Sequence, residues 1–249
     1  MLSSIFCKGN TLIRNAAKEP EIIDLQKFLN SMGAKIEGAG TSIIKITGVK
    51  KLHDTVYSIM PDRIEVGTFL CAGAATRGDI EVTNCNYEHI IPILNKLKEI
   101  GCNLDIKKDI IKIKANKRLN SIPKIETLPY PGFPTDMQSV IVSTLTTCEG
   151  DSLMVENIFE NRYKYVIELS KMGADITING PKALIKGVEF LKGAEVQAKD
   201  LRGGAALVIA GVMAKGITKV QNIEYIERGY ENFDAKLNSL GANIKKCEN

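Results

Sequence analysis

Four loop segments of this sequence place charged side chains where helices are expected to begin. The segments are PGFPTDMQ with Asp136, ENRYKYVIEL with Arg162, KDLRGGAAL with Arg202 and YIERGYENF with Arg228. Arg202 is predicted in the first turn of a helix and Arg228 at another helix start, where a cation opposes the helix dipole unless an anion is bound too. A guanidinium group can hold a carboxylate or a phosphate through two parallel hydrogen bonds. These placements therefore predict a site for a small anion.

Two interpretations of Asp136 follow from its surroundings. Pro131 and Pro134 stiffen the approach to this residue and hold its carboxylate at a loop edge. A carboxylate in such a place could act as a general base if a closing substrate removed it from water. The simpler interpretation is a helix cap, because an aspartate at a helix start accepts hydrogen bonds from the free amides of the first turn.

The elements that position these residues are four copies of one unit. The copies share the segments FLNSMGAKI, KLKEIGCNL, ELSKMGADI and KLNSLGANI, whose glycines are Gly33, Gly101, Gly173 and Gly241. Apolar residues three or four apart precede each glycine, as Ile22, Leu25 and Leu29 do in the first copy, and predict helices with one buried face. Each glycine fits a left-handed position after its helix, and a strand is predicted to follow.

Each copy also contains a second glycine, followed by a short predicted strand and an asparagine. The glycines are Gly9, Gly78, Gly150 and Gly216, and the asparagines are Asn15, Asn84, Asn157 and Asn222. The repeated order of helix, glycine turn, strand, loop and helix predicts an α/β fold built of βα units. We expect a parallel or mixed sheet with helices on one face.

In three copies a further helix is predicted to open at an aspartate. The three equivalent residues are Asp62 in MPDRIEVGTF, Asp136 in FPTDMQSVIV and Asp200 in AKDLRGGAAL. The first copy has no such start, because MLSSIFCKG matches only the last turns of that helix. We therefore expect the first unit to be truncated and the chain to be a fragment, a split product or one half of a two-chain assembly.

The composition of the chain argues against a nucleic acid, a membrane or a metal ion as its partner. The chain has 249 residues, of which 44% are apolar, and its net charge of +4 is too small to predict a nucleic acid partner. No apolar run approaches the ~20 residues that span a bilayer, so no membrane partner is expected. The six cysteines lack metal-ligand spacing, and His53 and His89 are interpreted as packing or surface residues. We expect a cytoplasmic protein without a metal or a cofactor.

Together with KEPEIIDL and MPDRIEVGTF, the four loop segments closely resemble the enolpyruvyl transferases, and among them the UDP-N-acetylglucosamine 1-carboxyvinyltransferase family. The resemblance covers essentially the whole chain. It implies an inside-out α/β barrel of two domains, each with three repeats, and an active site in the cleft between them. Residues 1–60 would be a remnant of the first domain, and residues 61–249 most of the second. The family's N-terminal segment, which enters the second domain, has no counterpart here, so an open sheet edge is expected.

The same resemblance implies roles for five residues. Asp136 would take the proton from the 3′-hydroxyl of UDP-N-acetylglucosamine, with Ile158 at the adjoining substrate contact. Arg162, Arg202 and Arg228 would bind the carboxylate and phosphate of phosphoenolpyruvate and the charge that develops during addition and elimination. The implied reaction transfers enolpyruvyl to the sugar nucleotide, the first committed step of peptidoglycan synthesis.

The family's Lys-Asn pair and its loop with an acidic Cys or Asp do not match any segment of this sequence. The reaction needs proton delivery to the vinyl carbon as well as proton removal from the hydroxyl, so one carboxylate is not a complete acid–base set. The chain alone is therefore expected to be inactive.

Three other interpretations stay open. A related enolpyruvyl transferase of the shikimate pathway shares the fold, although the PGFPTDMQ and FENR-type segments argue against it. A functional half that assembles with a separate N-terminal chain would be active only on mixing. A non-enzymatic repeat module would use its charged residues as caps, so Asp136→Ala and Arg162→Ala would change stability by ~0.5–2 kcal/mol and affect no ligand.

Overall fold

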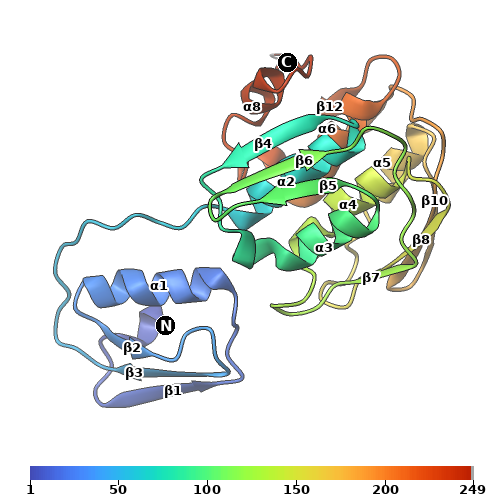
Figure 1. Cartoon of the computed structure of the whole chain (residues 1–249). Helices are drawn as coiled ribbons and strands as arrows, with labels where there is room; N and C mark the ends of the chain where they lie inside the picture. Colours follow the sequence, from blue (N-terminus) through green and yellow to red (C-terminus); the bar gives the residue numbers. More distant parts are fainter. Residues whose placement is uncertain (248–249) are drawn as a thin grey trace. The chain divides into compact units, whose positions relative to one another are not determined.

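The computed structural model describes residues 1–247, which divide into two compact units (Figure 1). The first unit consists of Met1–Pro61 and Pro129–Gly132, and the second of Asp62–Leu128 and the residues from Phe133 onward. All five residues with predicted roles belong to the second unit. The candidate site can therefore be built from the second unit alone.

The first unit is one repeat, with a helix against a small antiparallel sheet. Its elements are the 3-10 turn η1 (Leu2–Ser4), β1 (Asn10–Arg14), α1 (Pro20–Ser31), β2 (Lys35–Glu37) and β3 (Ile43–Thr47), with strand order β1-β3-β2. Alternate residues of β3 are buried, and Ile44 and Ile46 share a core cluster with Leu29 of α1. This cluster is separate from the core of the second unit.

Three helices form the centre of the second unit. They are α2 (Arg63–Ala75), α4 (Gln138–Leu145) and α6 (Leu201–Met213). Every residue of α4 is buried, as is every residue of α2 except Glu65. A helix that is buried all round needs apolar or small residues on every face, and apart from Arg63 and Gln138 the buried positions of these two helices provide them. The Ser143 hydroxyl of α4 donates to the Ala206 carbonyl of α6 at 2.9 Å, which joins two of the helices.

Three sheets lie around these helices. The first is antiparallel, in the order β4-β6-β5, with β4 (Asp79–Thr83), β5 (Asn103–Ile106) and β6 (Ile110–Lys114). The second has the order β7-β8-β10-β9, with β7 (Lys124–Glu126), β8 (Asp151–Val155), β9 (Asp175–Asn179) and β10 (Lys182–Lys186). The third is the parallel pair β11 (Glu195–Gln197) and β12 (Lys219–Gln221). Figure 1 shows β4 and β6 lying over α2, so that helices are inside and sheets outside.

Shorter helices complete the second unit. They are η2 (Tyr87–Ile90), α3 (Ile91–Glu99), η3 (Thr135–Met137), α5 (Val166–Lys171), α7 (Glu224–Glu227) and α8 (Phe233–Ser239). In α8, the predicted apolar spacing places Phe233 and Leu237 in the core, whereas Leu240, just past the helix, is exposed. Among residues 1–247, no helix has the length and hydropathy needed to cross a bilayer.

The pairing of strands differs in part from the predicted parallel or mixed sheet. Only β7 with β8 and β11 with β12 are parallel, and two of the four sheets within residues 1–247 are entirely antiparallel. Gly180 and Pro181 alone connect β9 to β10. A connection this short can join only antiparallel neighbours, because a parallel crossover needs about a dozen residues or more.

The repeat glycines adopt the predicted left-handed conformation after their helices. Their φ angles are +96° at Gly33, +105° at Gly101, +89° at Gly173 and +100° at Gly241. The last copy departs from the prediction, because residues 242–247 follow Gly241 without forming a strand. A strand needs a hydrogen-bonded neighbour, and within residues 1–247 the strand β12 of this copy pairs with β11 alone.

The turn after β10 brings distant backbone segments into close contact. A Cβ atom at Gly187 would lie 1.6 Å from the carbonyl oxygen of Cys148. The guanidinium group of Arg118 donates to the carbonyl groups of these same two residues, at 3.3 Å and 3.1 Å, and to two further carbonyl groups. Arg118 thereby binds two carbonyls beyond the C-terminal end of α4, those of Thr147 and Cys148, and two beyond the end of β10. The first unit repeats the close approach between Gly48 and Cys7.

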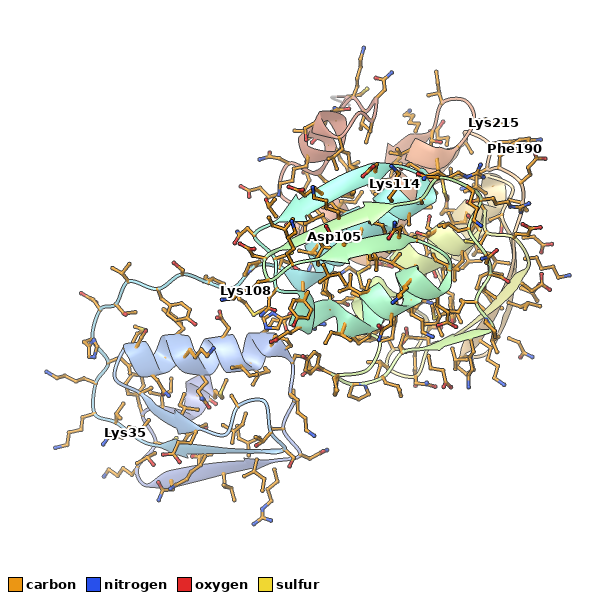
Figure 2. The ribbon with its side chains drawn as sticks, viewed as in Figure 1. Lys35, Asp105, Lys108, Lys114, Phe190 and Lys215 are labelled. Carbon is orange, nitrogen blue, oxygen red and sulfur yellow. The ribbon has the colours of Figure 1, made fainter. Side chains whose placement is uncertain are left out.

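The C-terminal ends of the central helices meet at a polar hollow of about 370 Å³. Its lining includes Arg77, Thr147 and Lys215, one from just beyond each of the three helices. Lys215 Nζ lies 3.6 Å from the centre of the Phe190 ring, and Figure 2 labels both side chains. Cations are favourable at the negative ends of helix dipoles. Contacts along the helices show that α2 and α4 run in the same direction. The Thr68 hydroxyl lies 4.0 Å from Met137 Sδ, and further along both helices the Thr144 hydroxyl donates to the Cys71 carbonyl at 3.5 Å.

Thiol reactivity provides a first test of this core. Cys7 and Cys247 are exposed, and the other four cysteines are buried. Burial raises the pKa of Cys102 and of Cys148 to about 12, and thiolate is the reactive form. In the folded protein, we expect an aromatic disulfide reagent to label the two exposed thiols rapidly, and all six after guanidinium denaturation. Rapid labelling of a third thiol in the folded chain would contradict the described core.

Candidate functional site

Three equivalent aspartates stand at the starts of the central helices, but only two of them act as caps. Asp62 accepts hydrogen bonds from the amides two and three residues later, at 2.7 Å and 3.1 Å. Asp200 accepts one from the amide three residues later at 2.8 Å. Asp136 lies inside the 3-10 turn η3 and makes no cap hydrogen bond to η3 or α4. The interpretation of Asp136 as a cap is therefore wrong, because the extra turn moves it past the capping position.

Asp136 instead binds two arginines. Its Oδ1 accepts a hydrogen bond from Arg162 Nη2 at 2.9 Å, and its Oδ2 accepts one from Arg202 Nη2 at 3.0 Å. The two arginine side chains are 16% and 14% exposed, whereas the Asp136 side chain is 40% exposed. The arginines are thus largely covered by protein, and the carboxylate is the part of this ion-pair cluster that is most open to a ligand.

An aromatic ring supports Arg202 from one side. The guanidinium carbon lies 5.5 Å from the centre of the Tyr230 ring, within the range of a cation–π contact. Tyr230 is 2% exposed, and its hydroxyl shares a hydrogen bond of 2.9 Å with the hydroxyl of Thr68 in α2. Burial raises the pKa of Tyr230, so that its hydroxyl stays protonated. Residues from α2, α6 and the segment after α7 therefore fix Arg202 together.

Arg162 is held by the loop in which it lies and by the segment of Asp136. Its Nη2 also donates to the carbonyl of Thr135 at 3.3 Å, and its guanidinium carbon lies 5.3 Å from the centre of the Phe159 ring. Arg162 Nε and Arg202 Nη1 are both buried without a hydrogen-bond partner within residues 1–247. A buried donor that stays unpaired costs roughly 1–3 kcal/mol. Both arginines therefore have a hydrogen-bond donor left with which they could bind a further anion.

Ile158 lies in the same loop, between β8 and α5. Ile158 is 41% exposed, and Phe159 beside it is 54% exposed. Large apolar side chains that are this open are available for contact with the apolar face of a ligand. The structure thus places Ile158 four residues before Arg162 in a loop of the site, and its role as a substrate contact stays a prediction.

The sequence interpretation did not single out Glu156, which is buried at 4% exposure. Its Oε1 accepts from the Thr127 hydroxyl at 2.8 Å and from the amides of Ile158 and Phe159 at 2.9 Å and 3.1 Å. Its Oε2 accepts from the Thr135 hydroxyl at 3.0 Å. The only signal in the sequence was a glutamate directly after a predicted strand, and nothing in that pattern separates a buried carboxylate from an exposed one.

Arg228 does not lie at a helix start, which corrects the prediction for this residue. It is the C-cap of the short helix α7, and α8 begins only at Phe233. A cation is electrostatically favourable at a C-terminal end, so the position of Arg228 does not by itself imply an anion. Its side chain is exposed, and within residues 1–247 no hydrogen bond or ion pair joins it to Asp136. A role for Arg228 in binding phosphoenolpyruvate stays a prediction.

Comparison with known proteins assigns the chain to a family. A family model described as EPSP synthase (3-phosphoshikimate 1-carboxyvinyltransferase) matches residues 1–237. The chain belongs to the EPSP synthase family. The enolpyruvyl transferase NikO from Streptomyces tendae has a crystal structure that superposes with a TM-score of 0.86 at 26% identity, covering 98% of this chain and 58% of that one. This likeness confirms the inside-out α/β fold that the sequence predicted.

Within the EPSP synthase family, two curated relatives bear the same name. The chain is 58% identical over 244 residues to UDP-N-acetylglucosamine 1-carboxyvinyltransferase 2 of Caldanaerobacter subterraneus subsp. tengcongensis, covering 98% of this chain and 58% of the relative. It is 51% identical over 250 residues to UDP-N-acetylglucosamine 1-carboxyvinyltransferase of Finegoldia magna, covering 100% of this chain and 59% of the relative. The chain therefore spans a little under three fifths of the length of these two relatives.

For a member of a carboxyvinyltransferase family, the Asp136 cluster offers two kinds of interaction at one place. Two guanidinium groups can bind the charges of an anionic substrate, and an exposed carboxylate oxygen can accept a hydroxyl proton. Each carboxylate oxygen has two acceptor positions, so Asp136 can receive a hydroxyl group without releasing either arginine. Among residues 1–247, no group of three or more His, Cys, Asp or Glu side chains is arranged to hold a metal ion.

Proposed function

We propose that this chain supplies the catalytic base and the phosphoenolpyruvate-binding arginines of a UDP-N-acetylglucosamine 1-carboxyvinyltransferase. The observation that carries the proposal is the pair of hydrogen bonds from Arg162 and Arg202 to the two oxygens of Asp136. The names of the relatives at 58% and 51% identity support the sugar nucleotide over shikimate phosphate as the acceptor. Ile158 and Arg228 are proposed to contact the sugar nucleotide and phosphoenolpyruvate, respectively.

In the proposed reaction, Asp136 takes the proton of the 3′-hydroxyl while the sugar oxygen bonds to C2 of phosphoenolpyruvate and C3 takes up a proton. Loss of a proton from C3 and of phosphate from C2 then restores the vinyl group. The arginines are already in place for the charge that develops on the phosphate and carboxylate, so no reorganisation is needed at that moment. Asp136 cannot hold the hydroxyl proton and protonate C3 at once, so a second acid–base group is required.

We further propose that this second group lies in the part of the relatives that the chain does not match, on the same chain or on a separate N-terminal half. Residues 1–60 and 61–249 are then parts of the first and second transferase domains. The six cysteines are free thiols, which supports a reducing compartment, and we place the protein in the cytoplasm.

Phosphate release from phosphoenolpyruvate and UDP-N-acetylglucosamine tests this proposal. The chain should be measured alone, and then mixed with the part of the Caldanaerobacter relative that the chain does not match. We expect release only from the mixture, together with co-elution of the two polypeptides in size-exclusion chromatography. A co-eluting mixture that releases no phosphate would contradict the proposal, and release with shikimate 3-phosphate instead of the sugar nucleotide would support the shikimate alternative.

A further inference from the structure

Glu156 has no part in the proposed chemistry, yet the segment that leads to Asp136 and the loop that carries Ile158 and Arg162 meet at its carboxylate. We propose that Glu156 is a positioning residue, which fixes the segments of Thr135 and Phe159 so that Arg162 can hold Asp136 in place. This inference rests on the proposed function and deepens it. It concerns the geometry of the site and assigns Glu156 no contact with a substrate.

One connection from Glu156 to the ion-pair cluster runs through Thr135. Glu156 Oε2 accepts the Thr135 hydroxyl at 3.0 Å, while the carbonyl of the same threonine accepts from Arg162 Nη2 at 3.3 Å. Thr135 is the residue directly before Asp136, in the turn η3. The backbone that carries the proposed base is therefore held on one side by Glu156 and on the other by Arg162.

A second connection runs through Phe159. Glu156 Oε1 accepts the amides of Ile158 and Phe159 at 2.9 Å and 3.1 Å, which fixes the turn after β8. The ring of Phe159 lies 5.3 Å from the guanidinium carbon of Arg162. The same carboxylate also accepts the hydroxyl of Thr127, beyond the end of β7, at 2.8 Å. Three chain segments that are separate in sequence thus share one buried acceptor.

The arrangement requires a carboxylate at this place. All four partners donate, and two of them are backbone amides that cannot reverse the direction of their hydrogen bonds. A glutamine has one acceptor oxygen, which the amides of Ile158 and Phe159 would occupy. Its NH₂ group would then face the Thr135 hydroxyl, which can rotate to accept. The Glu156→Gln variant should therefore fold, but its contact with the Thr135 hydroxyl should be weaker, so that the segment of Asp136 is held less firmly.

The Nε–H signal of Arg162 in ¹H–¹⁵N spectra of the full chain provides a direct test. Arg162 Nε is buried, so its proton is protected from solvent and can be followed. In Glu156→Gln we expect this signal to shift and broaden, while the signal of Arg118, anchored by four carbonyl groups, stays in place. An unchanged Arg162 signal in the folded variant would overturn the proposal.

Glu168→Gln is the matched control, because Glu168 is an equally buried carboxylate in the same unit, at 2% exposure. Its partners are the Lys171 ammonium at 2.6 Å, the Gln197 amide at 3.1 Å and the Lys199 ammonium at 3.5 Å. None of them lies in the segments of Thr127, Thr135 and Phe159 that Glu156 joins, although Lys199 precedes the helix of Arg202. We expect Glu168→Gln to lower the melting temperature but leave the Arg162 signal unchanged. A shift of that signal as large as the one in Glu156→Gln would show a general loss of order and overturn the specific role.

Kinetics of the mixed transferase give a second readout. Glu156→Gln is expected to lower kcat on the order of a hundredfold, as small misplacements of reacting groups do, with a smaller change in KM. A kcat equal to that of the unaltered protein would count against the proposal. If the unaltered mixture releases no phosphate, the proposed function fails, and the Arg162 spectra still decide whether Glu156 positions the cluster.

Discussion

Asp136→Asn is expected to lower the turnover number of the assembled transferase about a thousandfold, within the range that general base catalysis contributes. Asparagine has the shape of aspartate, but its amide cannot take up the hydroxyl proton. Its NH₂ group would also face one of the two guanidinium groups that now donate to the carboxylate. Phosphate release at saturating substrate, with a melting curve to show that the chain is folded, measures the effect.

Asp62→Asn is the control that the repeat offers for this substitution. Asp62 occupies the equivalent position at α2 and caps two amides of its first turn. Asparagine caps a helix about as well as aspartate does, so activity and melting temperature should both be retained. If Asp136→Asn kept most of its activity while Asp62→Asn behaved in the same way, Asp136 would not be the base.

Gly187→Ala is expected to destabilise the chain by about 4 kcal/mol or more, at the extreme end of the range for single substitutions. The added Cβ would lie 1.6 Å from the Cys148 carbonyl oxygen, far inside contact distance, and backbone atoms cannot move aside as a flexible side chain does. The shift would also break the hydrogen bond from the Gly187 amide to the Gly150 carbonyl at 3.0 Å. Urea unfolding followed by circular dichroism measures the loss.

Gly78→Ala is the matched control for this effect. A Cβ there would have the Thr76 side-chain hydroxyl at 3.3 Å as its nearest neighbour, and neither glycine has a positive φ angle. The two substitutions therefore differ in steric contact rather than in backbone conformation. We expect a change below about 1 kcal/mol for Gly78→Ala. Equal stability of the two variants would show that the approach of residues 187 and 148 is looser than described.

Features that depend on local sequence could be predicted well. Gly33 and its three equivalents take the left-handed conformation because the chain must turn sharply after each helix, a demand that sequence spacing reveals. Asp62 and Asp200 cap their helices because a cap needs only its own first turn. The apolar spacing in α1 and α8 marked their buried faces for the same reason, although Leu240 proved exposed.

Features that depend on distant residues could not be predicted in this way. Asp136 is followed by Arg162 after 26 residues and by Arg202 after 66, and only the folded chain shows that both draw its carboxylate away from the helix. Glu156 gave no signal because its burial comes from three segments that meet in space. Arg228 was misplaced because the sequence does not show that α7 ends before it.

A repeated fold holds spare copies of each structural position, and the three aspartates at the starts of the central helices show how such redundancy can be used. Two copies keep their cap, while the third gives up a contact worth about 1 kcal/mol and gains two ion pairs. The carboxylate that is released stands just before α4 and beside the first turn of α6, where Arg202 lies. In a fold built of repeats, one repeat can thus place a side chain in a functional site while the equivalent residues of the other repeats keep their structural role. The repeat that departs from the shared pattern is therefore the first place to look for function.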